Sequence, residues 1–314
     1  STLMRSSAAS DVYKRQEFLQ RMSHDIRTPI NGICGMINVA DHYADNMEKQ
    51  TECRAKIKKT SHLLLELINE VLDMSKLESD EVVLEDIPFN LNSIFEEILG
   101  VIEHMAAEQN IRIIWEEKEV THWNLIGSPV HVKRILMNIL SNAVKYNKEN
   151  GYVYISCREI PSKQTAMPTL EFVCRDTGIG MTEAFQKRIF EPFAQEHAGS
   201  RTKFAGTGLG MPIIKKYIDM MYGTIEVESK QGEGSKFTVT LEYRIADKSY
   251  YEQDTEKSSD VDETDRISGK HILLAEDNDL NAEIAQFILE DMGLMVDRVE
   301  DGVQCVSRLS LIHI

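Results

Sequence analysis

Residues Ser23–Gly32 read SHDIRTPING, and the residues around this stretch follow a helical pattern. Apolar side chains recur every three or four positions within residues 18–37, which is the spacing of one helical face. At about 100° per residue, His24 falls opposite this apolar stripe, so we expect its imidazole to face solvent. Asp25 follows directly and can orient the ring, and Pro29 should bend the helix about one turn later.

Two helices are predicted in the first domain, which we place at residues 17–84. The first covers about residues 17–45, a polar turn lies within residues 41–51, and the second helix ends near Glu78. Each helix carries one apolar stripe, and two antiparallel helices bury two such stripes poorly on their own. We therefore expect a homodimeric four-helix bundle, with a monomeric hairpin packed on the next domain as the alternative.

The composition limits the class of protein. The chain has 314 residues, enough for two or three domains, and a formal net charge of −16. This acidic balance argues against nucleic acid as a partner, because such a surface needs clustered Lys and Arg. The five cysteines show no paired spacing, so we expect a reduced, cytoplasmic chain without structural zinc. No apolar run approaches the roughly 18 residues that cross a bilayer, so this fragment should make no membrane contact.

The two ends of the chain lack a clear pattern. Residues 1–16 show no period and run abruptly into the first helix, and residues 307–314 stop in the middle of a domain. We interpret them as a non-native leader and tail, with frayed natural termini as the alternative. A sensor region is then expected upstream, and an anchor in the bacterial plasma membrane stays open for the full-length protein.

Strands and helices alternate over residues 85–246, which predicts an α/β two-layer sandwich with helices on one face of a mixed sheet. One helix should begin at Pro129, with Ser128 as its N-cap. Its polar residues share one face at positions i, i+4, i+7 and i+8: Asn138, Asn142, Lys145 and Tyr146. Amide oxygens suit Mg²⁺, a lysine suits phosphate, and a tyrosine ring can lie beside a base. A solvated polar face is the alternative.

Two glycine-rich turns follow in the same domain. The first comes after a predicted strand that ends at Asp176, and its Gly178 and Gly180 allow a flat ligand to approach the backbone while the carboxylate accepts from an exocyclic amine. The second, Gly206–Met211, leads into a helix, where backbone N–H groups and the helix dipole favour phosphate. Neither turn identifies a nucleotide site by itself, because ordinary turns use the same residues.

The stretch Ser23–Gly32 resembles the phosphoacceptor box of sensor histidine kinases. The polar helix and the two turns, in this order, resemble the ATP-binding (Bergerat-type) domain of the same kinases, within the superfamily that includes the gyrase, Hsp90 and MutL ATPases. The resemblance implies that His24 accepts the γ-phosphoryl group of ATP and that Asp25 acts as its base. It also implies that Thr28 places a water molecule when phosphate is removed from a partner.

The same resemblance assigns the ligand contacts. Asn138 and Asn142 would hold Mg²⁺, Lys145 would contact phosphate, and Tyr146 would flank the adenine. Asp176 would bind the adenine amino group. The remaining nucleotide-binding residues would be Gly178 and Gly180, the lid residues Phe190, Phe193 and Arg201, and the phosphate-turn residues Gly206, Thr207, Gly208, Leu209 and Gly210.

Residues 247–269 are rich in Asp and Glu, which predicts an extended linker. Residues 270–306 resemble the first part of a response-regulator receiver domain, in which Glu276 and Asp277 would bind Mg²⁺. The sequence stops before the strand that would supply a phosphoacceptor aspartate, so this receiver and its metal site are incomplete.

These features together predict a hybrid sensor histidine kinase with ATP and Mg²⁺ as cofactors. It would phosphorylate itself on His24 and pass the phosphoryl group to a receiver aspartate. The expected partners are a second copy, a response regulator and a histidine phosphotransfer protein. The alternatives are an ATP-driven conformational machine of the gyrase or Hsp90 type and a catalytically silent nucleotide-binding scaffold.

Overall fold

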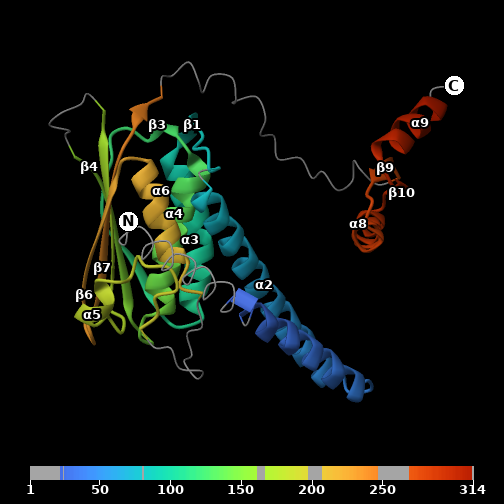
Figure 1. The fold of residues 1–314 in the computed structure, drawn as a ribbon, viewed down its shortest axis with the longest axis horizontal. Coiled ribbons are helices and arrows are strands. Elements are labelled where there is room, and N and C mark those ends of the chain that lie inside the picture. The colour runs from blue at the N-terminus through green and yellow to red at the C-terminus, as the bar shows by residue number, and fades with distance from the viewer. Residues whose placement is uncertain are drawn as a thin grey trace, which may run out of the picture. The chain divides into compact units, whose positions relative to one another are not determined.

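The computed structural model describes residues 22–23, 25–79, 81–160, 167–196, 207–246 and 269–312 (Figure 1). The chain divides into two compact units, residues 1–250 and residues 251–314. The first unit contains a helical hairpin and an α/β module, and the second contains two strands and two helices. Within the described residues, no helix combines the length and hydrophobicity that crossing a bilayer requires.

The helical hairpin forms where the sequence predicts it. Residues 25–42 are helical, a turn follows, and α2 spans Met47–Glu78. Asn46 caps α2, because its side chain accepts from the backbone N–H of Lys49 at 3.0 Å. Farther along the hairpin, a Cβ built on Gly32 would lie 3.7 Å from Cγ2 of Thr60, so the two helices are in contact there.

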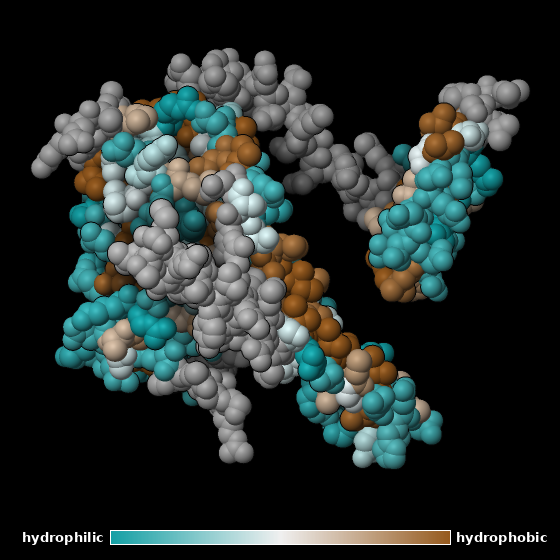
Figure 2. Space-filling view, viewed as in Figure 1, coloured by the Kyte–Doolittle hydropathy of each residue, from teal (hydrophilic) through white to brown (hydrophobic). Residues whose placement is uncertain are grey.

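The hairpin exposes much of its apolar surface. Figure 2 shows hydrophobic residues along this part of the molecule. Ile68 and Leu72 of α2 are 37% and 51% exposed, and Ile30 and Ile37 of the first helix are 43% and 45% exposed. These stripes are the ones for which the sequence predicts burial in a second copy.

The α/β module contains two sheets. A small antiparallel sheet has the order β1 (Ile87–Asn90), β3 (Asn124–Gly127), β8 (Arg244–Ile245). The main sheet has the order β2 (Arg112–Glu119), β4 (Tyr152–Ile160), β5 (Thr169–Asp176), β7 (Gly234–Glu242), β6 (Thr224–Lys230). β2 pairs parallel with β4 and the other pairs are antiparallel, so the sheet is mixed, with β2 and β6 at its edges.

Three helices cover one face of the main sheet: α3 (Leu91–Ala107), α4 (Pro129–Lys145) and α6 (Gly210–Met220) (Figure 1). A single turn of helix, α5 (Glu183–Gln186), lies near β6. Alternate residues of β4 are buried, including Val153 and Ile155, and they belong to the same core as Ile135 and Ile139 of α4. The predicted two-layer α/β sandwich is confirmed.

The described part of the second unit starts with two paired strands. β9 (His271–Ala275) and β10 (Met295–Val299) pair in parallel, joined by α8 (Asp279–Asp291). A further helix, α9, spans Gly302–Ile312 and so continues beyond residue 306, where the sequence predicts the end of the folded segment.

Candidate functional site

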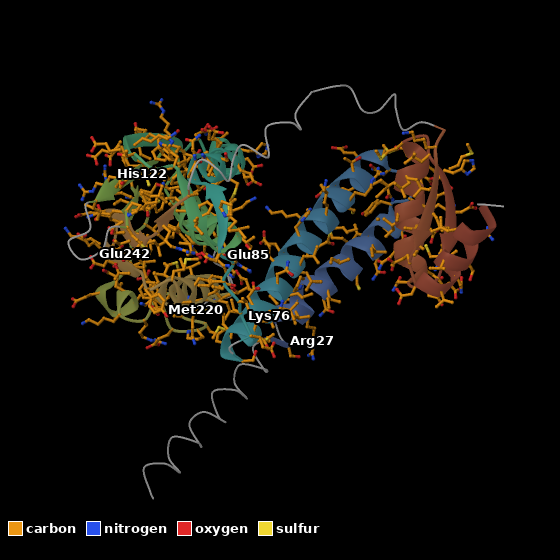
Figure 3. The ribbon with its side chains drawn as sticks, turned by 90° about the horizontal axis from the view of Figure 1, so that it is seen from above. Arg27, Lys76, Glu85, His122, Met220 and Glu242 are labelled. Carbon is orange, nitrogen blue, oxygen red and sulfur yellow. The ribbon has the colours of Figure 1, made fainter. Side chains whose placement is uncertain are left out.

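A cavity of about 210 Å³ opens between α4, α6, the end of β5 and the side of α2. α2 runs alongside α6, which Figure 3 shows from above together with Lys76 on α2 and Met220 at the end of α6. The cavity therefore has walls from the α/β module and one wall from the helical hairpin.

The polar face of α4 forms one wall. Asn142 Nδ2 donates to Asn138 Oδ1 at 3.0 Å, so the two amides lie together at the cavity surface. Lys145 Nζ lies 5.2 Å from the ring centroid of Tyr146. Burial lowers the pKa of Lys145, and nearby Glu70 partly offsets this effect. The predicted face is therefore directed into a cavity and is not a solvated surface.

Asp176 also lines the cavity, at the end of β5. It is 8% exposed, and its Oδ1 accepts from the backbone N–H groups of Gly178 at 2.7 Å and Ser235 at 3.3 Å. Burial raises its pKa to about 6, even though these bonds and Lys148 act in the other direction. Since both bonds end on Oδ1, Oδ2 is the oxygen that remains for a ligand among the described residues.

The first glycine turn is fixed by close packing. A Cβ on Gly178 would lie 2.3 Å from the backbone oxygen of Tyr146, and Gly180 has a φ of +62°. Buried Asn147 supports the turn, because it donates to Tyr152 O at 3.0 Å and accepts from Thr177 Oγ1 at 3.3 Å. These contacts hold the end of α4 against the end of β5.

The second glycine turn leads into α6. Gly208 has a φ of +74°, and its oxygen accepts from the backbone N–H of Phe193 at 3.0 Å. A Cβ on Gly210 would lie 2.3 Å from Asn138 Nδ2, so only glycine lets the start of α6 approach the amide pair this closely. The start of α6 thus forms the end of the cavity nearest Lys145 and Thr207.

Most of the predicted nucleotide contacts meet at this cavity. Its walls include Asn138, Asn142, Lys145, Tyr146, Asp176, Gly180, Thr207, Gly208 and Gly210. Gly178, Phe190, Phe193 and Leu209 lie behind the walls, where they pack or bond to the residues that line it. His24, Arg201 and Gly206 lie outside the described residues.

Ser128 differs from its predicted role. It stands at the N-cap position of α4, yet its hydroxyl makes no capping bond to the backbone. The hydroxyl instead bonds to the ring Nδ1 of His131 at 2.6 Å. His131 packs edge-on against Tyr217 of α6, with ring centroids 4.6 Å apart, so Ser128 helps to fix α4 against α6.

Sequence reasoning missed the contribution of α2. Thr207 Oγ1 donates to the carboxylate of Glu70, which lines the cavity from the hairpin side. One turn farther along α2, Asp73 pairs with Arg134 of α4. Glu66, Glu70 and Asp73 have the spacing i, i+4 and i+7, so they share one helical face, and that spacing was the available signal.

Two predicted residues of the phosphoacceptor stretch, Asp25 and Thr28, lie on the first helix. Asp25 is half-buried and Thr28 is exposed.

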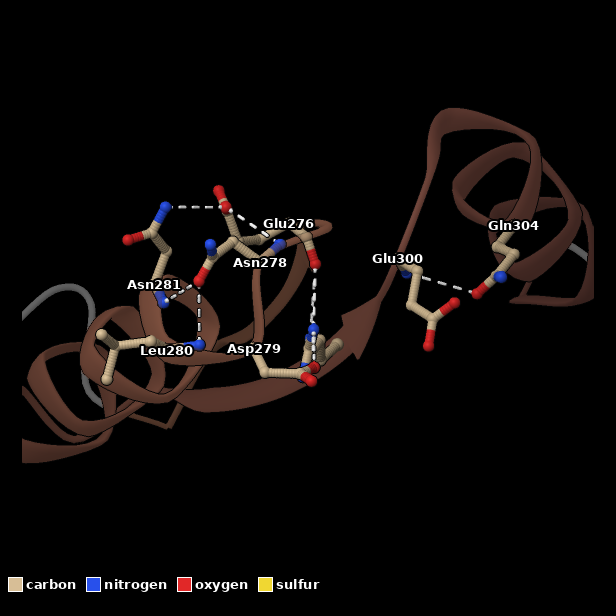
Figure 4. A network of polar contacts seen from close by, with 8 residues as sticks. Glu276, Asn278, Asp279, Leu280, Asn281, Glu300 and Gln304 are labelled. Atoms are coloured by element: carbon tan, nitrogen blue, oxygen red, sulfur yellow. Dashed lines mark hydrogen bonds and ion pairs between the residues drawn. The ribbon is translucent and has the colours of Figure 1, made fainter.

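In the second unit, Glu276 Oε1 accepts from Asn281 Nδ2 at 3.1 Å and from the backbone N–H of Asn278 at 3.3 Å (Figure 4). Glu276 therefore already supports the start of α8.

Amide oxygens fit the expected magnesium ion. No group of three or more His, Cys, Asp or Glu side chains suited to a metal occurs among the described residues. A nucleotide-borne Mg²⁺ does not need such a group, because it keeps waters and phosphate oxygens and takes few protein ligands. The adjacent amides of Asn138 and Asn142 match that requirement.

Two family models match the chain. Residues 14–80 match the His Kinase A (phospho-acceptor) domain, and residues 127–245 match the histidine kinase-, DNA gyrase B- and HSP90-like ATPase. The second match covers α4, β5 and α6, the elements that build the cavity.

The chain is similar to parts of longer proteins. The sensor protein GacS of Pseudomonas syringae pv. syringae is 32% identical over 292 residues, which cover 93% of this chain and 31% of GacS. Hybrid signal transduction histidine kinase K of Dictyostelium discoideum is 32% identical over 321 residues, 99% of this chain and 26% of that protein. The chain therefore spans about a third or less of the length of these relatives.

Solved structures share the fold. The complex of histidine kinase ThkA with the response regulator protein TrrA matches 75% of this chain and 64% of that one, with a TM-score of 0.55 and 23% identity. Full-length ShkA in complex with AMPPNP matches 93% of this chain and 57% of that one, with a TM-score of 0.54 and 23% identity. With both domain matches in one chain and with these relatives, the chain belongs to the family of hybrid sensor histidine kinases.

Proposed function

We propose that the chain transfers the γ-phosphoryl group of ATP to His24. The observation that carries this proposal is the cavity, in which an amide pair, a lysine, a buried carboxylate and a glycine turn converge. A helical hairpin that contains the His-Asp stretch precedes that cavity in the chain.

The cavity residues suit the two ends of ATP. Asp176 can accept a hydrogen bond from the adenine amino group, with the ring beside Tyr146. The start of α6 and Lys145 suit the phosphates, since backbone N–H groups, the helix dipole and a cation all favour negative charge. Asn138 and Asn142 would hold Mg²⁺, which offsets charge on the transferring group.

The reaction is a direct displacement. A ring nitrogen of His24 attacks the γ-phosphorus, the bond from that phosphorus to the β,γ-bridging oxygen breaks, and ADP leaves with the electron pair. Asp25 stabilises the charged ring and accepts its proton. General-base help of this kind contributes about 10²–10⁴ in rate. Phe190, Phe193 and Arg201 would belong to a lid over the phosphates, and Thr28 would serve phosphate removal from the partner.

The partners follow from the hairpin and the second unit. A second copy would cover the exposed apolar residues of the hairpin in a four-helix bundle. Phosphohistidine would then pass its group to a receiver aspartate, in this protein or in a separate response regulator, and onward through a phosphotransfer protein. β9, α8 and β10 would be the first part of such a receiver, with Glu276 and Asp277 towards its Mg²⁺.

Incubation with γ-labelled ATP tests the assignment. We expect wild type to acquire acid-labile, base-stable label and His24→Gln to acquire none while still binding ATP. Full labelling of His24→Gln would overturn the role of His24. Released phosphate without any protein-bound label would favour the ATP-driven conformational machine.

A further inference from the structure

A carboxylate from the hairpin lies inside the cavity of the α/β module. Glu70 of α2 is partly buried and lines the cavity beside Lys145 and Thr207. Thr207 Oγ1 donates to the Glu70 carboxylate and accepts from the backbone N–H of Leu209 at 3.1 Å. The carboxylate is therefore bonded to the turn from which α6 begins.

The groups around Glu70 are those that favour an anion. The start of the eleven-residue helix α6, the Thr207 hydroxyl and Lys145 all line the cavity with Glu70. Glu70 in turn raises the pKa of Lys145, which burial lowers. A carboxylate in this position makes contacts of the kind that a phosphate oxygen would make.

Further contacts hold Glu70 in place through α2. Asp73 pairs with Arg134 of α4, whose guanidinium lies over the ring of Tyr217 in α6. The buried side chains Met74 and Leu77 of α2 belong to the core of the α/β module. α2 is thus docked by both charge and apolar contacts, and the position of Glu70 depends on that docking.

We propose that Glu70 is a competitor for nucleotide phosphate, so that docking of α2 and binding of a triphosphate oppose one another. The inference rests on the proposed function, since it places the phosphates at the α6 end of the cavity. A triphosphate there brings several negative charges next to the Glu70 carboxylate and displaces it from Thr207. ATP therefore weakens the contact between α2 and the α/β module, whereas adenosine, which has no phosphate, does not.

Calorimetry on the full chain with Mg²⁺ tests this opposition. The ligands are ATP, ADP and adenosine, and the variants are Glu70→Gln, Asp73→Asn and Glu52→Gln. Glu52 is a matched control, because it is a glutamate on α2 about 27 Å away along the helix and forms local ion pairs with Lys49 and Lys56.

We expect Glu70→Gln to bind ATP at least fivefold more tightly than wild type, with a smaller gain for ADP and adenosine unchanged within twofold. Asp73 is not among the residues that line the cavity. A gain in ATP affinity in Asp73→Asn would therefore result from release of α2. Glu52→Gln should match wild type. Hydrogen exchange in residues 66–77 should increase when ATP is added to wild type.

Unchanged or weaker ATP binding by Glu70→Gln and Asp73→Asn would overturn the proposal. The proposed nucleotide site is tested separately with Asp176→Asn. If that variant loses ATP binding while the α2 variants behave as wild type, only the competition is refuted. If wild type and Asp176→Asn bind ATP equally, the site itself is refuted.

Discussion

Arg134 of α4 forms an ion pair with Asp73 of α2, and its guanidinium carbon lies 5.9 Å from the ring centroid of Tyr217 in α6. One side chain thus joins the hairpin to two helices of the α/β module. The side chain of Asp73 is mostly buried and that of Arg134 is about one-third exposed. The contribution of this ion pair to stability should therefore be intermediate between those of exposed and fully buried salt bridges.

We predict that Arg134→Met loosens α2 without unfolding the α/β module. Methionine keeps the apolar stem but removes the pair, at a cost of about 1–2 kcal/mol to the docked state. Hydrogen exchange should rise in residues 66–77 and stay constant in β5. Arg158→Met is the control, because Arg158 pairs with Glu171 on the main sheet. Equal protection of α2 in both variants would contradict this role.

Asp176→Asn should stabilise the nucleotide-free protein while abolishing nucleotide binding. The pKa of Asp176 is raised from 3.8 to about 6 by burial, so the folded state favours the protonated form. That stabilisation is complete below about pH 4 and is lost as the pH rises through 6. Asparagine stays neutral and can still accept the two backbone N–H bonds on its oxygen.

Urea denaturation of wild type and Asp176→Asn between pH 4 and 8 measures this effect. The variant should gain about 1–3 kcal/mol relative to wild type at pH 7, and the gain should vanish near pH 4. A gain that does not vary with pH would show that ionisation of Asp176 is not its cause. ATP affinity of wild type should fall below about pH 6, where the carboxylate becomes protonated.

Gly208→Ala should damage the second glycine turn. Its φ of +74° disfavours a side chain, and a Cβ would come within 2.9 Å of the backbone of Phe193. We expect the free energy of unfolding to fall by more than about 2 kcal/mol, because backbone strain and the steric clash both destabilise the folded state. ATP binding should become at least tenfold weaker. Gly232→Ala has a similar φ of +85° but open space around it, so it should cost only about 1 kcal/mol and leave ATP binding unchanged.

Asn147→Ala should separate the end of α4 from the end of β5. Asn147 is 4% exposed and bonds to Tyr152 O, to the N–H of Lys148 and to Thr177 Oγ1. Loss of these bonds should cost about 2–3 kcal/mol, because buried partners remain unsatisfied. Thermal denaturation measures this, with Asn92→Ala as the control, because Asn92 is only half-buried and makes solvent-exposed bonds to Glu96 and Lys118. A similar loss in both variants would show that burial of Asn147 is unimportant.

Local patterns predicted the parts of the site that lie within single elements. The spacing of Asn138, Asn142, Lys145 and Tyr146 depends only on helical geometry, and the structure directs all four into one cavity. Asp176 was identified because a polar residue ends a buried strand and two glycines follow.

Contacts between distant elements were not predictable from these patterns. Glu70 reaches Thr207 across 137 positions. The spacing of Glu66, Glu70 and Asp73 places them on one face of α2, but it does not indicate which distant residues that face contacts. β1 is also hard to predict, because it has only four residues and Pro88 lacks a backbone donor. It forms a strand because it lies at the edge of the small sheet, where a missing donor is tolerated.

The two edges of the main sheet have a consequence for assembly. β2 carries four consecutive charged residues, Glu116–Glu119, and β6 carries Glu226, Glu228 and Lys230. Charges along an exposed edge discourage strand-to-strand addition and the aggregation that follows from it. At high concentration, copies of this chain should therefore not associate by pairing the edge strands of their main sheets. Association through helical surfaces is not opposed in this way.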